Sequence, residues 1–298
     1  MSVATADGLT LAGRDRRFGL LLTAPGLLSL LIVITFPLFF TLFTSVHDYT
    51  LLTPNYDTFV GLENYEEALD EEYLPGSLWV TTKFVLASIV IEFIIGFAVA
   101  LSLHATRRFG SIYYLILLAP LLINPVVVGL LWRMLLHSEL GIINYAIGLV
   151  GISPVSWLGD ADIAFWTVVL TDIWHQVSFM AILLVAGLAA LPREPYEAAR
   201  MDGASTISCF IHITLPLMRP VIAVAILLRM IFAIKTFDIV FIMTKGGPGT
   251  ATDLISYYIY RAAFFGLDIG RASAMAAGLL VIIVALTAYL YRYMNSLK

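Results

Sequence analysis

The stretch YEAARMDGASTISCFIHITLPLMRP, from Tyr196 to Pro220, is a polar and partly basic segment between two long apolar runs. Good helix formers occupy Glu197 to Met201, and acidic Glu194 and Glu197 lie near what would be the positive end of that helix. Gly203 would end the helix or allow another backbone to approach closely. We therefore expect a short helix within a loop that joins two buried elements.

The rest of the chain has the composition of a membrane protein. Hydrophobic residues make up 60% of its 298 residues, charged residues make up 13%, and the mean hydropathy is +0.92. A bilayer crossing needs about 20 apolar residues. We expect an all-α polytopic protein with six transmembrane helices, the third interrupted by Asn124 and Pro125. The spans are expected at about 18–45, 79–104, 111–137, 163–191, 221–244 and 270–293.

The positions of the basic residues predict the orientation. The loop 46–78 carries eight acidic residues and no lysine or arginine, which places it outside. Only Lys245, Arg261 and Arg271 fall outside or at its edge. The tail 1–17, the loop 192–220 and both termini are then cytoplasmic. The turn between the second and third spans is cytoplasmic as well. Ten basic residues lie in these cytoplasmic segments: Arg14, Arg16, Arg17, Arg107, Arg108, Arg193, Arg200, Arg219, Arg292 and Lys298.

The loop also carries a spaced motif. Glu197, Ala198 and Ala199 are followed by Gly203 and, after nine intervening residues, by Ile213-Thr214-Leu215-Pro216. This pattern resembles the EAA–G–I–LP signature of the membrane subunits of binding-protein-dependent ABC importers. FVGLENY at 59–65 and KGGPG at 245–249 are similar to segments of the carbohydrate-uptake branch. The loop 46–78 is too short for the large periplasmic insertion of maltose-type subunits.

The resemblance implies a type I ABC importer permease fold in the bacterial inner membrane, with residues 18–298 as the transmembrane domain. It implies a second homologous permease subunit, two ATPase subunits that bind ATP and Mg, and a periplasmic solute-binding protein. The loop helix would dock on an ATPase. The chain has no Gly-x-x-x-x-Gly-Lys-Ser/Thr phosphate loop, so we expect neither catalytic residues nor ATP hydrolysis in it. The implied coupling residues are Glu197, Ala198, Ala199, Asp202, Gly203, Ile213, Leu215 and Pro216.

Polar and aromatic side chains at membrane depth indicate a solute pathway. Helical spacing places one group on the face of the fourth span and a second group on the fifth. Rings mixed with hydrogen-bonding groups suit a polyhydroxylated ligand, so we expect import of a sugar or sugar derivative. The expected pathway residues are Asp172, His175, Gln176, Phe179, Arg229, Phe232 and Thr236.

Alternatives remain open for these polar groups and for the solute. They could instead tie helices together, as Asp172 with Arg229, whereas an arginine unpaired with carboxylate would suit an anionic sulfonated or phosphorylated sugar. Glu92 and Arg133 could be structural or line the path, and Cys209 has no assigned role. The five histidines are too scattered for a metal site. Other possible functions are a permease for an amino acid, polyamine or anion, or a non-ABC membrane transporter or enzyme.

Overall fold

The computed structural model describes residues 11–52, 58–105 and 110–295. Predictions made for residues 1–10, for the side chains of residues 11–17, and for Arg107, Arg108 and Lys298 lie outside this description. The regular secondary structure within it is helical, with only isolated β-bridges at its edges. The predicted all-α class is therefore confirmed.

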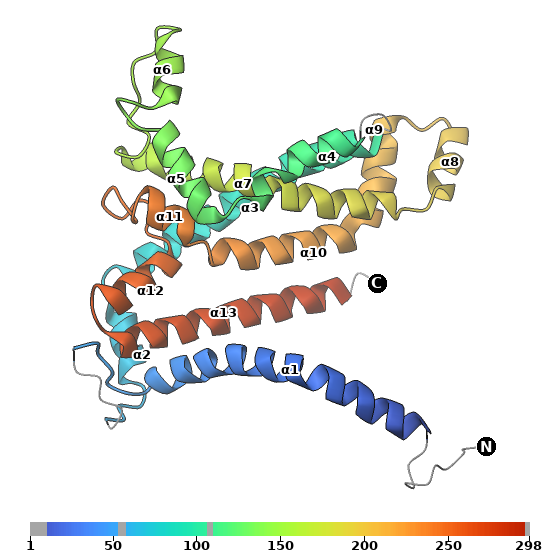
Figure 1. The fold of residues 1–298 in the computed structure, drawn as a ribbon. Helices are drawn as coiled ribbons and strands as arrows, with labels where there is room; N and C mark the ends of the chain where they lie inside the picture. Colours follow the sequence, from blue (N-terminus) through green and yellow to red (C-terminus); the bar gives the residue numbers. More distant parts are fainter. Residues whose placement is uncertain (1–10, 53–57, 106–109, 296–298) are drawn as a thin grey trace.

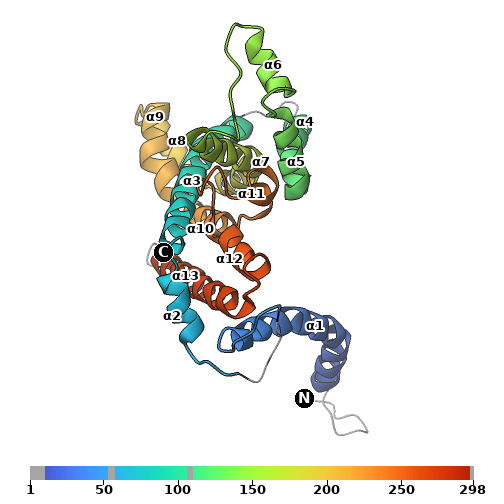
Figure 2. The ribbon, with the colours of Figure 1, turned by 90° about the vertical axis from the view of Figure 1, so that its left-hand side faces the viewer.

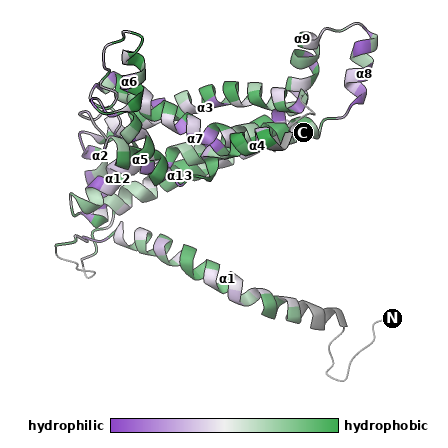
Figure 3. Cartoon of the chain, turned by 45° about the horizontal axis from the view of Figure 1, so that its top comes forward, coloured by the Kyte–Doolittle hydropathy of each residue, from purple (hydrophilic) through white to green (hydrophobic). Residues whose placement is uncertain are grey.

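Within the described residues, five helical stretches are long and apolar enough to cross a membrane. Helix α1 begins inside the predicted tail 1–17, because leucine, alanine and arginine there are good helix formers. Apolar residues cover the long helices, whereas hydrophilic residues gather on the short α8 (Figure 3). Four predicted spans correspond to single helices: α1 (Leu11–Thr44), α3 (Leu74–Ala105), α7 (Ala161–Ala189) and α13 (Ile269–Asn295).

The third predicted span, 111–137, is not one helix. It consists of α4 (Gly110–Leu118), the 3₁₀ turn η1 (Pro120–Leu122) and α5 (Pro125–Leu135). The Asn124 side chain accepts a hydrogen bond from Val126 N at 2.9 Å and so caps α5. Proline at 120 and at 125 removes two backbone donors, which explains the break at the place that the sequence indicated.

The fifth predicted span, 221–244, is displaced in the structure. Helix α10 (Leu215–Ile234) begins earlier, because a π-helical turn, η2 (Phe210–Thr214), leads into it and proline is tolerated in a first helical turn. It ends before Lys235, and the short α11 (Asp238–Met243) follows. At this interruption the Thr236 carbonyl accepts a hydrogen bond from the Ser256 hydroxyl of α12 (Ile255–Phe264).

The helix connections gather at two ends of the molecule (Figures 1 and 2). The start of α1, the end of α3, the start of α4 and the end of α13 lie at one end, together with α8 (Glu194–Met201) and α9 (Thr206–Cys209). Helices α2 (Glu63–Asp70), α11 and α12 lie at the other end, from which α6 (Ile142–Gly148) projects. The described segments that adjoin both termini therefore share an end with α8.

The core lies where α3, α7 and α10 pack together. A Cβ atom on Gly96 of α3 would lie 3.0 Å from Met180 Cγ of α7, and one on Gly187 of α7 would lie 2.7 Å from Val221 of α10. Small residues allow such close approach of membrane helices. In contrast, the side chains of α1 from Phe18 to Leu38 are exposed, and Thr44 reaches Ser273 of α13 through a 2.8 Å hydrogen bond.

Candidate functional site

Helix α8 is the predicted loop helix, and its end has a well-defined geometry. Gly203 lies just beyond it with φ +77°, in the left-handed region. Gly203 N donates to Arg200 O at 3.1 Å and Ala204 N donates to Ala199 O at 2.9 Å. These two bonds form a Schellman motif, for which glycine is the favoured residue. Within the described part of the chain nothing lies within 4 Å of a Cβ added at Gly203, so the left-handed backbone at the end of α8 accounts for the glycine here.

The return from α8 to α10 is also held in place. The Tyr196 hydroxyl of α8 lies 2.9 Å from Thr214 Oγ1 in η2, where Thr214 is buried. Leu215 packs against the core cluster at the start of α10, and Ile213 and Pro216 are half-buried beside it. On the other side of α8, Ala198 and Asp202 are exposed, and Met201 is 88% exposed. One face of α8 is therefore free for a partner.

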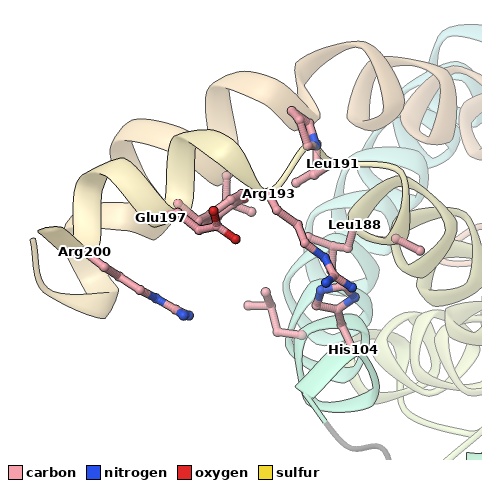
Figure 4. Close-up of a pocket in the computed structure, with 11 residues that line it drawn as sticks. His104, Leu188, Leu191, Arg193, Glu197 and Arg200 are labelled. Carbon is pink, nitrogen blue, oxygen red and sulfur yellow. The ribbon is translucent and has the colours of Figure 1, made fainter.

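A cavity of about 610 Å³ lies under the opposite face of α8 (Figure 4). Its walls come from the ends of α3 and α7 and from the segment Arg193–Arg200. The side chains of Arg193, Glu197 and Arg200 point into the space, and His104 of α3 faces them. Glu197 is thus the predicted coupling residue that lies on the cavity side of α8, not on its free side.

The polar groups at membrane depth fall into two sets, and the first set is buried. Arg229 of α10 donates to both oxygens of Glu92 in α3, at 2.5 and 2.9 Å, and to Asp172 Oδ2 in α7. All three side chains are almost fully buried. The pairing of Asp172 with Arg229, named above as the structural alternative, is therefore present. Recognition of an anionic sugar would require an arginine that is not paired with a carboxylate. Arg229 is paired with two carboxylates, so it does not meet this requirement.

Two more polar groups of α7 hold the broken third span. Buried His175 contacts Ile123 O through Nε2 at 3.0 Å, and Ser178 donates to Leu117 O. Carbonyl oxygens at the end of α4 and beside the break have no hydrogen-bond partner within a helix. The side chains of His175 and Ser178 provide these partners, which lipid cannot do. Arg133 of α5 likewise provides a hydrogen bond to a backbone carbonyl, because its guanidinium donates to Ile242 O of α11 at 3.0 Å.

The second set is partly exposed at the surface of this chain. Phe179 of α7 and Phe232 of α10 make an edge-to-face contact with ring centroids 5.4 Å apart. Phe232 is 46% exposed, Gln176 is half-buried on α7, and Thr236 is half-buried just beyond the end of α10. We call these four residues the aromatic–amide face. The predicted helix faces therefore meet, whereas a role of this face in solute passage stays a prediction.

Sequence reasoning left Glu92 undecided, and the structure brings it to Arg229. The sequence contained one signal, because Glu92 is the single carboxylate of a mostly apolar span and such a group needs a cationic partner. The local sequence pattern could not identify Arg229 as that partner, because 137 positions separate the two residues. Cys209 is half-buried in α9, and its surroundings suggest no chemistry.

Comparisons with known proteins agree with the motif in the loop. Residues 75–296 match the family model described as binding-protein-dependent transport system inner membrane component. The trehalose/maltose transport system permease protein MalF of Thermococcus litoralis is 36% identical over 274 residues, which cover 92% of each chain. The sulfoquinovosyl glycerol transport system permease protein SmoG of Agrobacterium fabrum is 34% identical, over 95% of this chain and 92% of that one.

A solved structure shows the same fold. It is that of a bacterial alginate ABC transporter in complex with an alginate pentasaccharide-bound periplasmic protein. One of its chains superposes with a TM-score of 0.79 and 21% identity, over 93% of this chain and 94% of that chain. At that identity the likeness concerns the fold alone. From the family match and these relatives, the chain belongs to the inner membrane components of binding-protein-dependent transport systems.

Proposed function

We propose that this chain is the permease subunit of a bacterial ABC importer that moves a sugar or sugar derivative from a periplasmic binding protein across the inner membrane. The observation that carries the proposal is the aromatic–amide face, formed by Gln176, Phe179, Phe232 and Thr236. Rings stack on the C–H faces of a sugar, and amide and hydroxyl groups bond to its hydroxyls. Two relatives named as permeases for sugar-containing solutes support this choice.

The aromatic–amide face forms one wall of the proposed pathway. Its side chains come from α7, from α10 and from Thr236 just after α10, and these two helices flank the α8 segment along the chain. A second, homologous permease subunit would close the opposite wall and leave a wet chamber at mid-membrane depth. Recognition in this chamber relies on rings and neutral polar groups, because Arg229 is already paired with two carboxylates.

The α8 segment would transmit motion from the ATPase subunits. The Schellman motif at Gly203 and the Tyr196–Thr214 contact join α8 firmly to α10, so a displacement of α8 would be passed to the wall of the pathway. Ala198, Met201 and Asp202 offer the exposed surface on which an ATPase would dock. ATP and Mg would be bound in the two separate ATPase subunits, and the α8 end of the molecule would be cytoplasmic.

Reconstituted transport tests the proposal. The permease pair and the ATPases are placed in proteoliposomes with ATP inside, and the binding protein loaded with a radiolabelled sugar is added outside. We expect uptake that stops when ATP is omitted or when the ATPase subunits carry an inactivated phosphate loop. Uptake that persists without ATP and follows an ion gradient would overturn the proposal. Uptake of an amino acid but of no sugar would overturn the choice of solute.

A further inference from the structure

The cavity under α8 is lined by opposite charges that form no ion pair with one another or with other described residues. Arg193 and Glu197 are four residues apart and Glu197 and Arg200 are three apart, spacings at which helical side chains readily pair. Within the described part of the chain, however, none of these three side chains forms an ion pair. All three instead line the same space of about 610 Å³ (Figure 4).

The cavity is separate from the surface that suits an ATPase. Its lining residues, Arg193, Tyr196, Glu197 and Arg200, follow the i, i+3, i+4, i+7 spacing of one helical face. Ala198 and Asp202, which are exposed, lie on the opposite side of α8 by the same helical spacing. A protein partner that covers that side would therefore leave the cavity facing the ends of the spans.

The cavity lies at the ends of two helices that are long and apolar enough to cross a membrane. Helix α3 ends at Ala105 and α7 ends at Ala189, and the residues just before these ends supply the apolar part of the lining, Leu101 and Leu188. Basic residues of bilayer-crossing proteins concentrate on the cytoplasmic side, where pockets between helices bind lipid headgroups. Apolar residues on the membrane side and arginines beyond them form the polarity gradient that a phospholipid requires.

We propose that this cavity binds the headgroup of an anionic phospholipid from the cytoplasmic leaflet. The two guanidinium groups of Arg193 and Arg200 take the phosphate, for which arginine provides paired donors. The Glu197 carboxylate accepts hydrogen bonds from headgroup hydroxyls. The acyl chains leave past Leu101 and Leu188. The inference rests on the cytoplasmic orientation contained in the proposed function, and it does not depend on which solute is carried.

Retention of defined lipids tests the inference. The complete importer complex is placed in phosphatidylcholine nanodiscs with a graded fraction of phosphatidylglycerol, and native mass spectrometry counts the phosphatidylglycerol that stays bound. We expect affinity to fall about fivefold for Arg193→Gln and again for Arg200→Gln, since an arginine near an anionic surface contributes about that factor. Arg193→Lys should keep most of the affinity.

Arg219 provides the matched control. It is an exposed arginine of α10 on the same side of the molecule and outside the cavity lining, so Arg219→Gln should bind phosphatidylglycerol as the wild type does. Equal losses for all three glutamine variants, or no loss in any, would overturn the inference. Thermal unfolding of each complex verifies that the variants are folded.

A second arm distinguishes lipid from free phosphate, and the readouts separate this inference from the proposed function. Inorganic phosphate titrated into phosphatidylcholine nanodiscs should bind more than tenfold more weakly than phosphatidylglycerol, because it lacks acyl chains. If phosphate binds with the same arginine dependence while no phosphatidylglycerol is retained, the lipid assignment is wrong. A complex that transports sugar but ignores phosphatidylglycerol contradicts only the lipid site. A complex that retains the lipid but moves no sugar contradicts only the function.

Discussion

Arg229 and Glu92 form a two-point ion pair across the core, with Nε to Oε2 at 2.5 Å and Nη2 to Oε1 at 2.9 Å. Asp172 completes the cluster from a third helix, so α3, α7 and α10 are tied together at one buried point. A charge in an apolar interior is tolerated only when it is paired and hydrogen-bonded. The cluster therefore constrains how these three helices are placed relative to one another.

Arg229→Gln should destabilise the complex strongly. The change leaves the carboxylates of Glu92 and Asp172 buried together without their cation, and breaking a buried pair in this way costs about 3–5 kcal/mol. Thermal unfolding of the purified importer complex measures the loss. Arg133→Gln is the matched control: that arginine is exposed and makes one hydrogen bond, so the expected loss is about 1 kcal/mol or less. Equal stability of the wild type and Arg229→Gln would contradict the role assigned to the cluster.

Phe232→Ala should weaken transport by raising the KM for the solute. The ring is half exposed on the aromatic–amide face and is supported by Phe179, so its loss removes a stacking surface for the sugar. Aromatic contacts contribute about 0.5–1.5 kcal/mol, which corresponds to a KM up to about tenfold higher. Phe39→Ala removes an exposed ring of α1 and should leave the KM unchanged. An unaltered KM in Phe232→Ala would exclude this ring from the pathway.

Gly203→Val should abolish uptake while the chain still inserts. Gly203 has a φ of +77°, and a β-branched residue in this left-handed conformation destabilises the backbone by about 1–2 kcal/mol or more. Asparagine adopts the same conformation more readily. Gly203→Asn should therefore retain uptake, and since both substitutions find open space, steric clash does not explain a difference. Uptake in vesicles, normalised to the amount of inserted complex, provides the measurement. Similar activities of the two variants would argue against a need for rigidity at the end of α8.

Cys209 can report the orientation of the molecule without any engineered residue in the chain. It is the single cysteine of the sequence, and it lies half-buried in α9 beside the α8 segment. A membrane-impermeant maleimide should label it in inside-out vesicles and leave it unlabelled in intact cells. In a Cys209→Ser background, Glu67→Cys at the opposite end, on exposed α2, should show the reverse pattern. Labelling of Cys209 from outside would invert the proposed topology.

Tyr258 should make stability depend on alkaline pH. Burial, and its hydrogen bond to Glu71 Oε2 at 3.0 Å, raise the pKa of Tyr258 from 10.0 to about 12. A pKa raised in the folded state gives stabilisation that is complete below pH 10 and is lost as the pH rises through about 12, because the unfolded phenol ionises first. Between pH 9 and 11 we expect a loss of about 1 kcal/mol from this group. Thermal unfolding over that range should show a smaller decline in Tyr258→Phe, and parallel curves would contradict the assignment.

The aromatic–amide face was partly predictable from spacing. The i, i+3, i+4, i+7 pattern placed Gln176 and Phe179 on one face of α7 and Phe232 on the side of α10 that meets it, whereas Thr236 lies just beyond the end of α10. It could not separate these residues from Asp172, His175 and Arg229, which share the same periodicity. Burial separates the two sets: Asp172, His175 and Arg229 turn toward α3 and the broken third span, whose positions a single helix pattern does not contain.

The sequence by itself determined the apolar spans, the break at Pro125, the helix end at Gly203 and the family, because each depends on residues that are close along the chain. Only the tertiary structure decided that Arg229 is paired with Glu92 and that the charges of α8 share a cavity with His104. The physical reason is that hydrophobic periodicity sets which face of a helix is buried, whereas packing between distant helices sets which polar groups meet there.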